Sequence, residues 1–140
     1  KDEFISQVID KLAKAMNKPV IQIGGFAKKC NSNKFLRAAG PAEFLALIKN
    51  ADFVITSSFH GTAFAVYFNK PFYVFGLKGI SLNSRMESLL RSVDLKDRFI
   101  TENIDIEKLH LNYDFNKVNL LIEEEKNYSK QFLDSVLKTN

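Results

Sequence analysis

Residues 53–75 read FVITSSFHGTAFAVYFNKPFYVF, and this stretch decides the fold because it contains a strand, a helix and a second strand. The run 53–56 is apolar and rich in β-branched residues, as is typical of a strand that is buried on both faces. After two serines the apolar residues follow helical spacing, and Lys70-Pro71 ends the predicted helix. Residues 72–75 form a second apolar strand. Two strands that are joined by a helix predict a parallel sheet.

The segments on either side continue this alternation of helices and strands. They are expected to form a helix over residues 4–16, a strand over 20–23, a polar loop over 28–34, a helix that starts at Gly40-Pro41, a helix that Ser84 caps in a Ser84-to-Glu87 capping box, and a long helix from about Asp114. The last helix is expected to bury an inner face made of Val118, Leu121, Ile122, Phe132, Val136 and Leu137. The predicted fold class is α/β, with a Rossmann-like parallel sheet and helices on both faces, in a single domain over residues 1–140.

The chain begins with a helix, whereas a doubly wound sheet begins with a strand that lies at its centre. We therefore expect a fragment of a longer protein whose first strand is missing. If this fragment folds alone, another segment must fill the gap, or the predicted strands 20–23 and 53–56 must pair directly.

Composition indicates a folded domain in a reducing compartment. Apolar residues make up 46% and charged residues 26%, which argues against disorder. The single cysteine, Cys30, rules out an internal disulfide bond. No apolar run reaches the roughly 18 residues that a membrane span needs. A cytoplasmic location is therefore expected.

Positive charge is concentrated in the first half of the chain. Seven cations and no acidic residue occur between positions 11 and 42, within a net charge of +4. Such an excess suits an anionic ligand such as a phosphate, a nucleotide or an acidic sugar, although an ordinary solvated face gives the same pattern. The lysines do not interleave with aromatic residues as stacking platforms for bases do, so no nucleic-acid partner is predicted.

The loops after the strands hold the candidate site, because ligands of open α/β sheets bind beyond the carboxyl ends of the strands. In residues 56–62 a buried strand passes directly into a helix, whose first N–H groups and dipole favour an anion. A histidine at such a position either contributes its imidazole to the ligand or merely caps the helix. The groups that can bind an anion there are the hydroxyls of Ser57, Ser58 and Thr62, the backbone of Gly61 and the imidazole of His60.

Two other loops contribute weaker candidates. Gly24-Gly25 follows the first predicted strand and lets a ligand approach the backbone, but two glycines also mark an ordinary turn. Arg85 lies in the first turn of the helix predicted to begin at Ser84, where its planar guanidinium can contact a phosphate or a carboxylate at two points. Without His60 nearby, Arg85 would be an ordinary surface residue. No metal site is predicted, because two distant histidines and one cysteine do not make a ligand set.

Several motifs together resemble those of polysaccharide pyruvyl transferases. The Ser-Phe-His-Gly block with its downstream Lys-Pro is the more specific part, and the likeness covers roughly residues 19–99. The motifs are NADFVITSSFHGTAF (residues 50–64), FNKPF (68–72) and SRMESLL (84–90), with PAEFL (41–45) before them and LKDR (95–98) after them.

The resemblance implies a GT-B-like enzyme with two Rossmann-like domains, of which this chain would be the C-terminal, donor-binding domain. It implies transfer of the pyruvyl unit of phosphoenolpyruvate to two hydroxyls of a sugar in a bacterial surface or extracellular polysaccharide, which gives a cyclic ketal and phosphate. His60 would be the catalytic residue, and no cofactor beyond the phosphoenolpyruvate donor is implied. The fragment alone would be inactive, because the acceptor glycan would bind across the cleft, on the missing N-terminal domain.

One position departs from the family pattern. Many members carry an arginine two positions before the histidine, where this chain has Ser58, so that contact to the donor must come from Arg85 or from the other domain. Two alternative functions stay open at this point. One is a sugar-nucleotide-dependent glycosyltransferase of the same architecture. The other is a non-catalytic module that holds an anionic glycan and depends on Lys28, Lys29 and Lys34.

Overall fold

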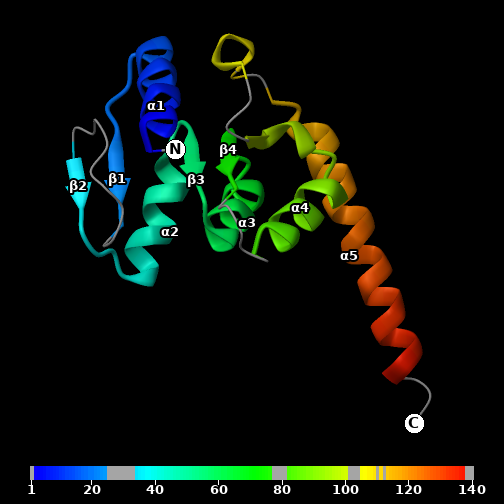
Figure 1. Ribbon diagram of the computed structural model, residues 1–140. Coiled ribbons are helices and arrows are strands. Elements are labelled where there is room, and N and C mark those ends of the chain that lie inside the picture. The colour runs from blue at the N-terminus through cyan, green and yellow to red at the C-terminus, as the bar shows by residue number, and fades with distance from the viewer. Residues whose placement is uncertain are drawn as a thin grey trace.

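The computed structural model describes residues 2–24, 34–76, 82–100, 105–109, 111 and 113–137. Helices and strands alternate along these residues, as the sequence predicts (Figure 1). The elements are α1 (Asp2–Met16), β1 (Ile21–Ile23), β2 (Lys34–Leu36), α2 (Pro41–Asn50), β3 (Val54–Thr56), α3 (Phe59–Tyr67), β4 (Phe72–Phe75), α4 (Leu82–Ser92), the 3-10 helix η1 (Lys96–Arg98), β5 (Phe99–Ile100), the 3-10 helix η2 (Ile106–Lys108) and α5 (Phe115–Leu137).

The described strands form two parallel sheets (Figure 1). In the larger sheet β4 lies between β3 and β5, with Val54 opposite Phe72 and Val74 opposite Phe99. In the smaller sheet β1 pairs with β2. The predicted α/β class with parallel strands is therefore confirmed.

Strand β4 is completely buried between two hydrophobic clusters. Phe72 and Val74 belong to one cluster, together with buried residues of α2, α3, α4 and α5. Tyr73 and Phe75 belong to the other, together with residues of α1 and β5. Because successive side chains alternate across a strand, this one strand packs against helices on both faces of the sheet. The predicted placement of helices on both faces is confirmed.

Residues 34–36 form strand β2, although the sequence predicted a polar loop that extends to Lys34. The prediction was wrong at this end because three residues are too few to show alternation. Main-chain hydrogen bonds extend the pairing: the N–H of Lys34 donates to the oxygen of Val20 at 3.2 Å, and the N–H of Gly24 donates to the oxygen of Leu36 at 3.1 Å. The direct pairing considered for the first two predicted strands is not seen, because these strands, β1 and β3, lie in different sheets.

Of two helix starts that were predicted from capping patterns, one is confirmed. Helix α2 begins at Pro41, with Gly40 as its N-cap. Helix α4 begins at Leu82, so Ser84 lies inside the first turn and is not the N-cap. The Ser-to-Glu spacing that indicates a capping box occurs here in a helix that has already begun. Arg85 still lies in the first turn of α4.

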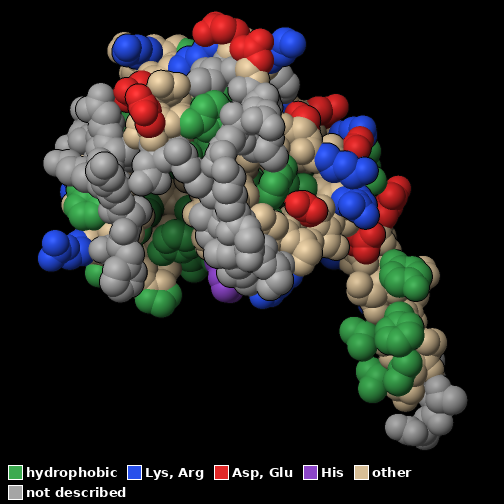
Figure 2. All heavy atoms as spheres, in the orientation of Figure 1, with side chains coloured by type: hydrophobic (Ala, Val, Ile, Leu, Met, Phe, Trp, Pro, Cys, Tyr) green, Lys and Arg blue, Asp and Glu red, His purple; other side chains and the backbone are tan. Residues whose placement is uncertain are grey.

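Helix α5 extends well beyond the rest of the molecule (Figure 1). Val118 near its start is buried, but Phe132, Val136 and Leu137 are 60%, 51% and 70% exposed. The prediction that these three residues face the core is therefore wrong, because the 23-residue helix is longer than the domain on which it packs. Figure 2 shows the resulting apolar patch near the end of α5. No helix among the described residues has the length and apolar character that crossing a membrane requires.

Candidate functional site

A two-residue turn, Ser57-Ser58, joins β3 to α3. The N–H of Ser58 donates to Oγ1 of Thr56 at 3.0 Å. Ser58 is the N-cap of α3, and its Oγ accepts the N–H of Gly61 at 3.4 Å. Its extended backbone, with φ −101° and ψ 136°, is typical of an N-cap. The hydroxyl groups of Thr56 and Ser58 therefore stabilise the turn from which the helix begins.

The first turn of α3 packs directly on the end of β3. A Cβ atom on Gly61 would lie 2.4 Å from Oγ1 of Thr56, a separation that real Cβ atoms essentially never show. Only a hydrogen atom fits at this position, so a glycine is required for the close approach. The approach brings the start of α3 to the carboxyl edge of the larger sheet, where the sequence predicts a ligand.

The polar groups of this turn are not all available to a ligand. Thr62 is fully buried, and its hydroxyl donates to the main-chain oxygen of Ser58 at 2.9 Å, so it acts inside the helix. Ser57 and His60 are exposed. The N–H groups of Phe59 and His60, the first two residues of the helix, have no acceptor within it. These two N–H groups, the Ser57 hydroxyl and the His60 imidazole show no hydrogen-bond partner in the described part of the chain.

Phe59 connects this turn to helix α4. Its ring is half-buried and packs against the hydrophobic cluster on the α3 side of the sheet. The guanidinium carbon of Arg85 lies 4.5 Å from the centre of the ring, within cation–π range. The His60 imidazole meets the same ring edge-on, with 5.9 Å between the ring centres and 78° between the planes. The structure thus brings His60 and Arg85, which come from two helices, to one phenyl ring.

The remaining predicted ligand-binding residues lie on other elements or outside the described part of the chain. Gly24 follows β1 in the smaller sheet, where its φ of 150° favours glycine. Lys34 is exposed at the start of β2. Gly25, Lys28 and Lys29 lie outside the described residues.

Sequence reasoning missed the contributions of Thr56 and Phe59. Threonine at the end of a strand gives a weak signal, since its hydroxyl can accept an N–H two residues further on. Phe59 lies inside the Ser-Phe-His-Gly block, but nothing in the sequence indicates that its ring, among thirteen phenylalanines, contacts an arginine. Its contact with Arg85 depends on how α3 and α4 pack together.

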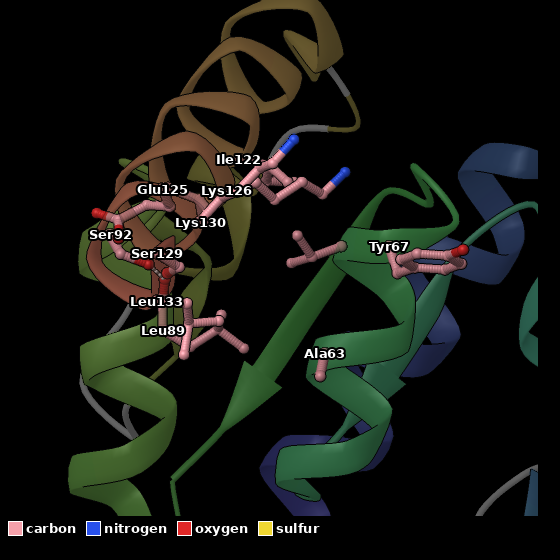
Figure 3. A pocket seen from close by; sticks show the side chains of 12 residues that line it. Ala63, Tyr67, Leu89, Ser92, Ile122, Glu125, Lys126, Ser129, Lys130 and Leu133 are labelled. Atoms are coloured by element: carbon pink, nitrogen blue, oxygen red, sulfur yellow. Dashed lines mark hydrogen bonds between the residues drawn. The ribbon is translucent and has the colours of Figure 1, made fainter. Parts of the chain in front are cut away.

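A separate groove lies between α3, α4 and α5 (Figure 3). It is open, has a volume of about 550 Å³ and has largely apolar walls, to which Tyr67, Leu89 and Ile122 contribute. Neither His60 nor Arg85 lines it, so it is distinct from the predicted site. Within the described ranges, no three His, Cys, Asp or Glu side chains are grouped so that they could hold a metal ion.

The family model for polysaccharide pyruvyl transferase matches residues 3–79. The matched segment includes β3 and α3, and therefore the turn with Ser58, Phe59 and His60. Because it covers more than half of the chain, the chain belongs to the polysaccharide pyruvyl transferase family. Arg85 and α5 lie beyond the matched segment. No curated protein and no solved structure gives a significant match.

Proposed function

We propose that this chain binds the phosphoenolpyruvate donor of a pyruvyl transferase at the turn between β3 and α3. The observation that carries the proposal is the arrangement of Arg85 and His60 around the Phe59 ring, beside the first N–H groups of α3. Phosphoenolpyruvate carries a tetrahedral phosphate and a planar carboxylate. A guanidinium can contact either of these oxyanions at two points. The N–H groups and dipole of the helix start add roughly 0.3–1 kcal/mol of attraction for an anion.

The proposed reaction converts an enol phosphate and two sugar hydroxyls into a cyclic ketal. A proton adds to the methylene carbon of phosphoenolpyruvate, which leaves a cationic centre at C2. The two hydroxyl oxygens form bonds to C2. The bond between C2 and the phosphate oxygen breaks, and inorganic phosphate leaves. The two hydroxyl protons balance the proton gained by the methylene carbon and the proton carried by the phosphate.

His60 is assigned the role of acid and electrostatic partner in this reaction. In its protonated form the exposed imidazole can donate a proton to the donor, or it can stabilise the phosphate as it departs. General acid help of this kind typically contributes about 10² to 10⁴ in rate. The proposal places the acceptor glycan on a second, N-terminal domain and the enzyme in the cytoplasm.

Donor binding tests the first half of the proposal. The thermal unfolding of the 140-residue chain is measured with phosphoenolpyruvate and, separately, with UDP-sugars. A ligand that binds only the folded state raises the midpoint of unfolding. We expect a rise with phosphoenolpyruvate alone. A rise with UDP-sugars alone would favour a glycosyltransferase and overturn the proposal.

Turnover tests the role of His60. In the intact transferase, His60→Ala is expected to lower kcat for phosphate release at least about 100-fold. Lys49→Ala, which changes an exposed residue of α2, is the control and is expected to leave kcat unchanged. Turnover by His60→Ala within a factor of about two of the wild type would remove His60 from the chemistry.

A further inference from the structure

We propose that Phe59 is a positioning residue: its ring holds the Arg85 guanidinium at the start of α3, so that Arg85 and His60 act on one anionic ligand. The inference rests on the proposed function, in which that ligand is phosphoenolpyruvate. It assigns to a side chain without polar atoms the task of bringing together groups from α3 and α4.

The Phe59 ring can serve as a fixed platform because it is anchored. It is half-buried and packs against the cluster that includes Val66 of α3 and Met86 of α4. Arg85 and His60 are both exposed, and an exposed arginine samples many rotamers, whose loss on binding costs conformational entropy. Contact with an anchored ring at 4.5 Å restricts the guanidinium before any ligand arrives. A restricted donor loses less entropy when it binds.

A cation above a ring can still bind an anion. The guanidinium carries five N–H donors in a planar fork, and the contact of its carbon with the ring takes the place of no hydrogen-bond acceptor. No acidic side chain in the described part of the chain forms an ion pair with Arg85 that would occupy those groups. The imidazole of His60 contacts the same ring at 5.9 Å. One ring therefore contacts both the two-point donor and the imidazole.

The arrangement also accounts for the departure at Ser58. Ser58 is the N-cap of α3 and its hydroxyl accepts the N–H of Gly61, so it performs a structural task there. The guanidinium that reaches this turn comes instead from Arg85, which contacts the ring of the residue between Ser58 and His60. The neighbouring helix thus supplies a planar cation to the turn.

Calorimetric binding of phosphoenolpyruvate to the 140-residue chain tests this role. Phe59→Leu keeps an apolar side chain but removes the π face, and is expected to weaken binding about five- to tenfold. Phe59→Tyr keeps the π face and is expected to bind within about twofold of the wild type. On an Arg85→Ala background, Phe59→Leu should weaken binding no further, because the ring then has no guanidinium to hold.

Phe64→Leu is the matched control. Phe64 is another half-buried phenylalanine of α3 that packs against the same cluster, and its recorded ring contacts are with Phe44 and Phe68. This variant should lose stability much as Phe59→Leu does but should keep wild-type affinity. Equal affinities for Phe59→Leu and Phe64→Leu, or additive effects of the Phe59 and Arg85 changes, would overturn the positioning role alone. Failure of the wild-type chain to bind phosphoenolpyruvate would overturn the proposed function together with this inference.

Discussion

Gly61 and Thr56 approach so closely that a methyl group at position 61 would overlap the threonine hydroxyl oxygen. The same oxygen accepts the N–H of Ser58. One hydroxyl group therefore fixes the turn and also limits what the first turn of α3 can contain. The position of His60 at the sheet edge depends on this contact, because His60 directly precedes Gly61.

The contact predicts that Gly61→Ala is destabilising. The added carbon must displace Thr56 or the start of α3, and overpacking of this kind costs about 1–3 kcal/mol. Gly40→Ala is the control, because a Cβ there meets nothing within 4 Å, and it should cost less than about 1 kcal/mol. Urea unfolding measures both. Combining Gly61→Ala with Thr56→Ala should cost less than the sum of the single changes, and a purely additive result would contradict the proposed overlap.

The N-cap of α3 predicts a second effect on stability. Ser58→Ala removes the hydroxyl that accepts the N–H of Gly61 and is expected to lower the free energy of unfolding by about 0.5–1 kcal/mol. Ser57→Ala is the neighbouring control. Ser57 is exposed, shows no side-chain hydrogen bond in the described part of the chain, and should change stability by less than about 0.5 kcal/mol. Equal losses in the two variants would show that Ser58 does not cap the helix.

The environment of Tyr113 predicts that the effect of Tyr113→Phe on the free energy of unfolding depends on pH. Its hydroxyl is buried without a hydrogen-bond partner among the described residues, and its ring lies under the Arg98 guanidinium at 4.5 Å. Burial raises the pKa of Tyr113. Tyr113→Phe keeps the ring and removes the unsatisfied hydroxyl, so at pH 7 it should leave the free energy of unfolding unchanged or raise it by up to about 1 kcal/mol.

The raised pKa of Tyr113 fixes the sign of the change at alkaline pH. The unfolded chain ionises this tyrosine near pH 10, whereas the folded chain keeps it neutral, so the wild type loses stability as the pH rises past about 10. Tyr113→Phe cannot undergo this loss. Its advantage over the wild type should therefore widen between pH 7 and about 10.5 in urea unfolding. A constant difference would mean that the folded and unfolded states ionise the hydroxyl alike.

The same valine-to-alanine substitution is expected to cost much stability at the start of α5 and little at its end. Val118 is 2% exposed and Val136 is 51% exposed. Val118→Ala is expected to cost about 1.5–3 kcal/mol of unfolding free energy, while Val136→Ala should cost less than about 0.5 kcal/mol. Thermal or urea unfolding of the two variants measures the difference. A large loss for Val136→Ala would show that the far end of α5 is covered in solution.

The course of the chain between residues 53 and 75 was predictable, because each element there has a strong local signal. A run of β-branched residues marks β3, an apolar run rich in aromatic residues marks β4, and Lys70-Pro71 marks the end of the helix between them. Strand β2 lacked such a signal. It is a strand because its backbone pairs with β1, and pairing between segments is not visible in the period of a three-residue run.

Burial along α5 and the environment of His60 were predictable only in part. Helical spacing gave the correct face for Val118, but it carries no information on where the domain ends, so Phe132 was wrongly assigned to the core. The two serines indicated that His60 would lie at a helix start, and it does. The contact of Phe59 with Arg85 joins residues 26 positions apart on two helices, and depends on tertiary packing.

The division of β4 between two hydrophobic clusters has a consequence for how the molecule opens. Phe72 and Val74 belong to one cluster and Tyr73 and Phe75 to the other. Detachment of α1 would uncover only one side of the strand, and separation of α3 and α4 would uncover only the other, so in either event β4 keeps cover on one face and its pairing with β3 and β5. The backbone amides of β4 should therefore exchange their hydrogens with solvent most slowly, and only through unfolding of the whole domain.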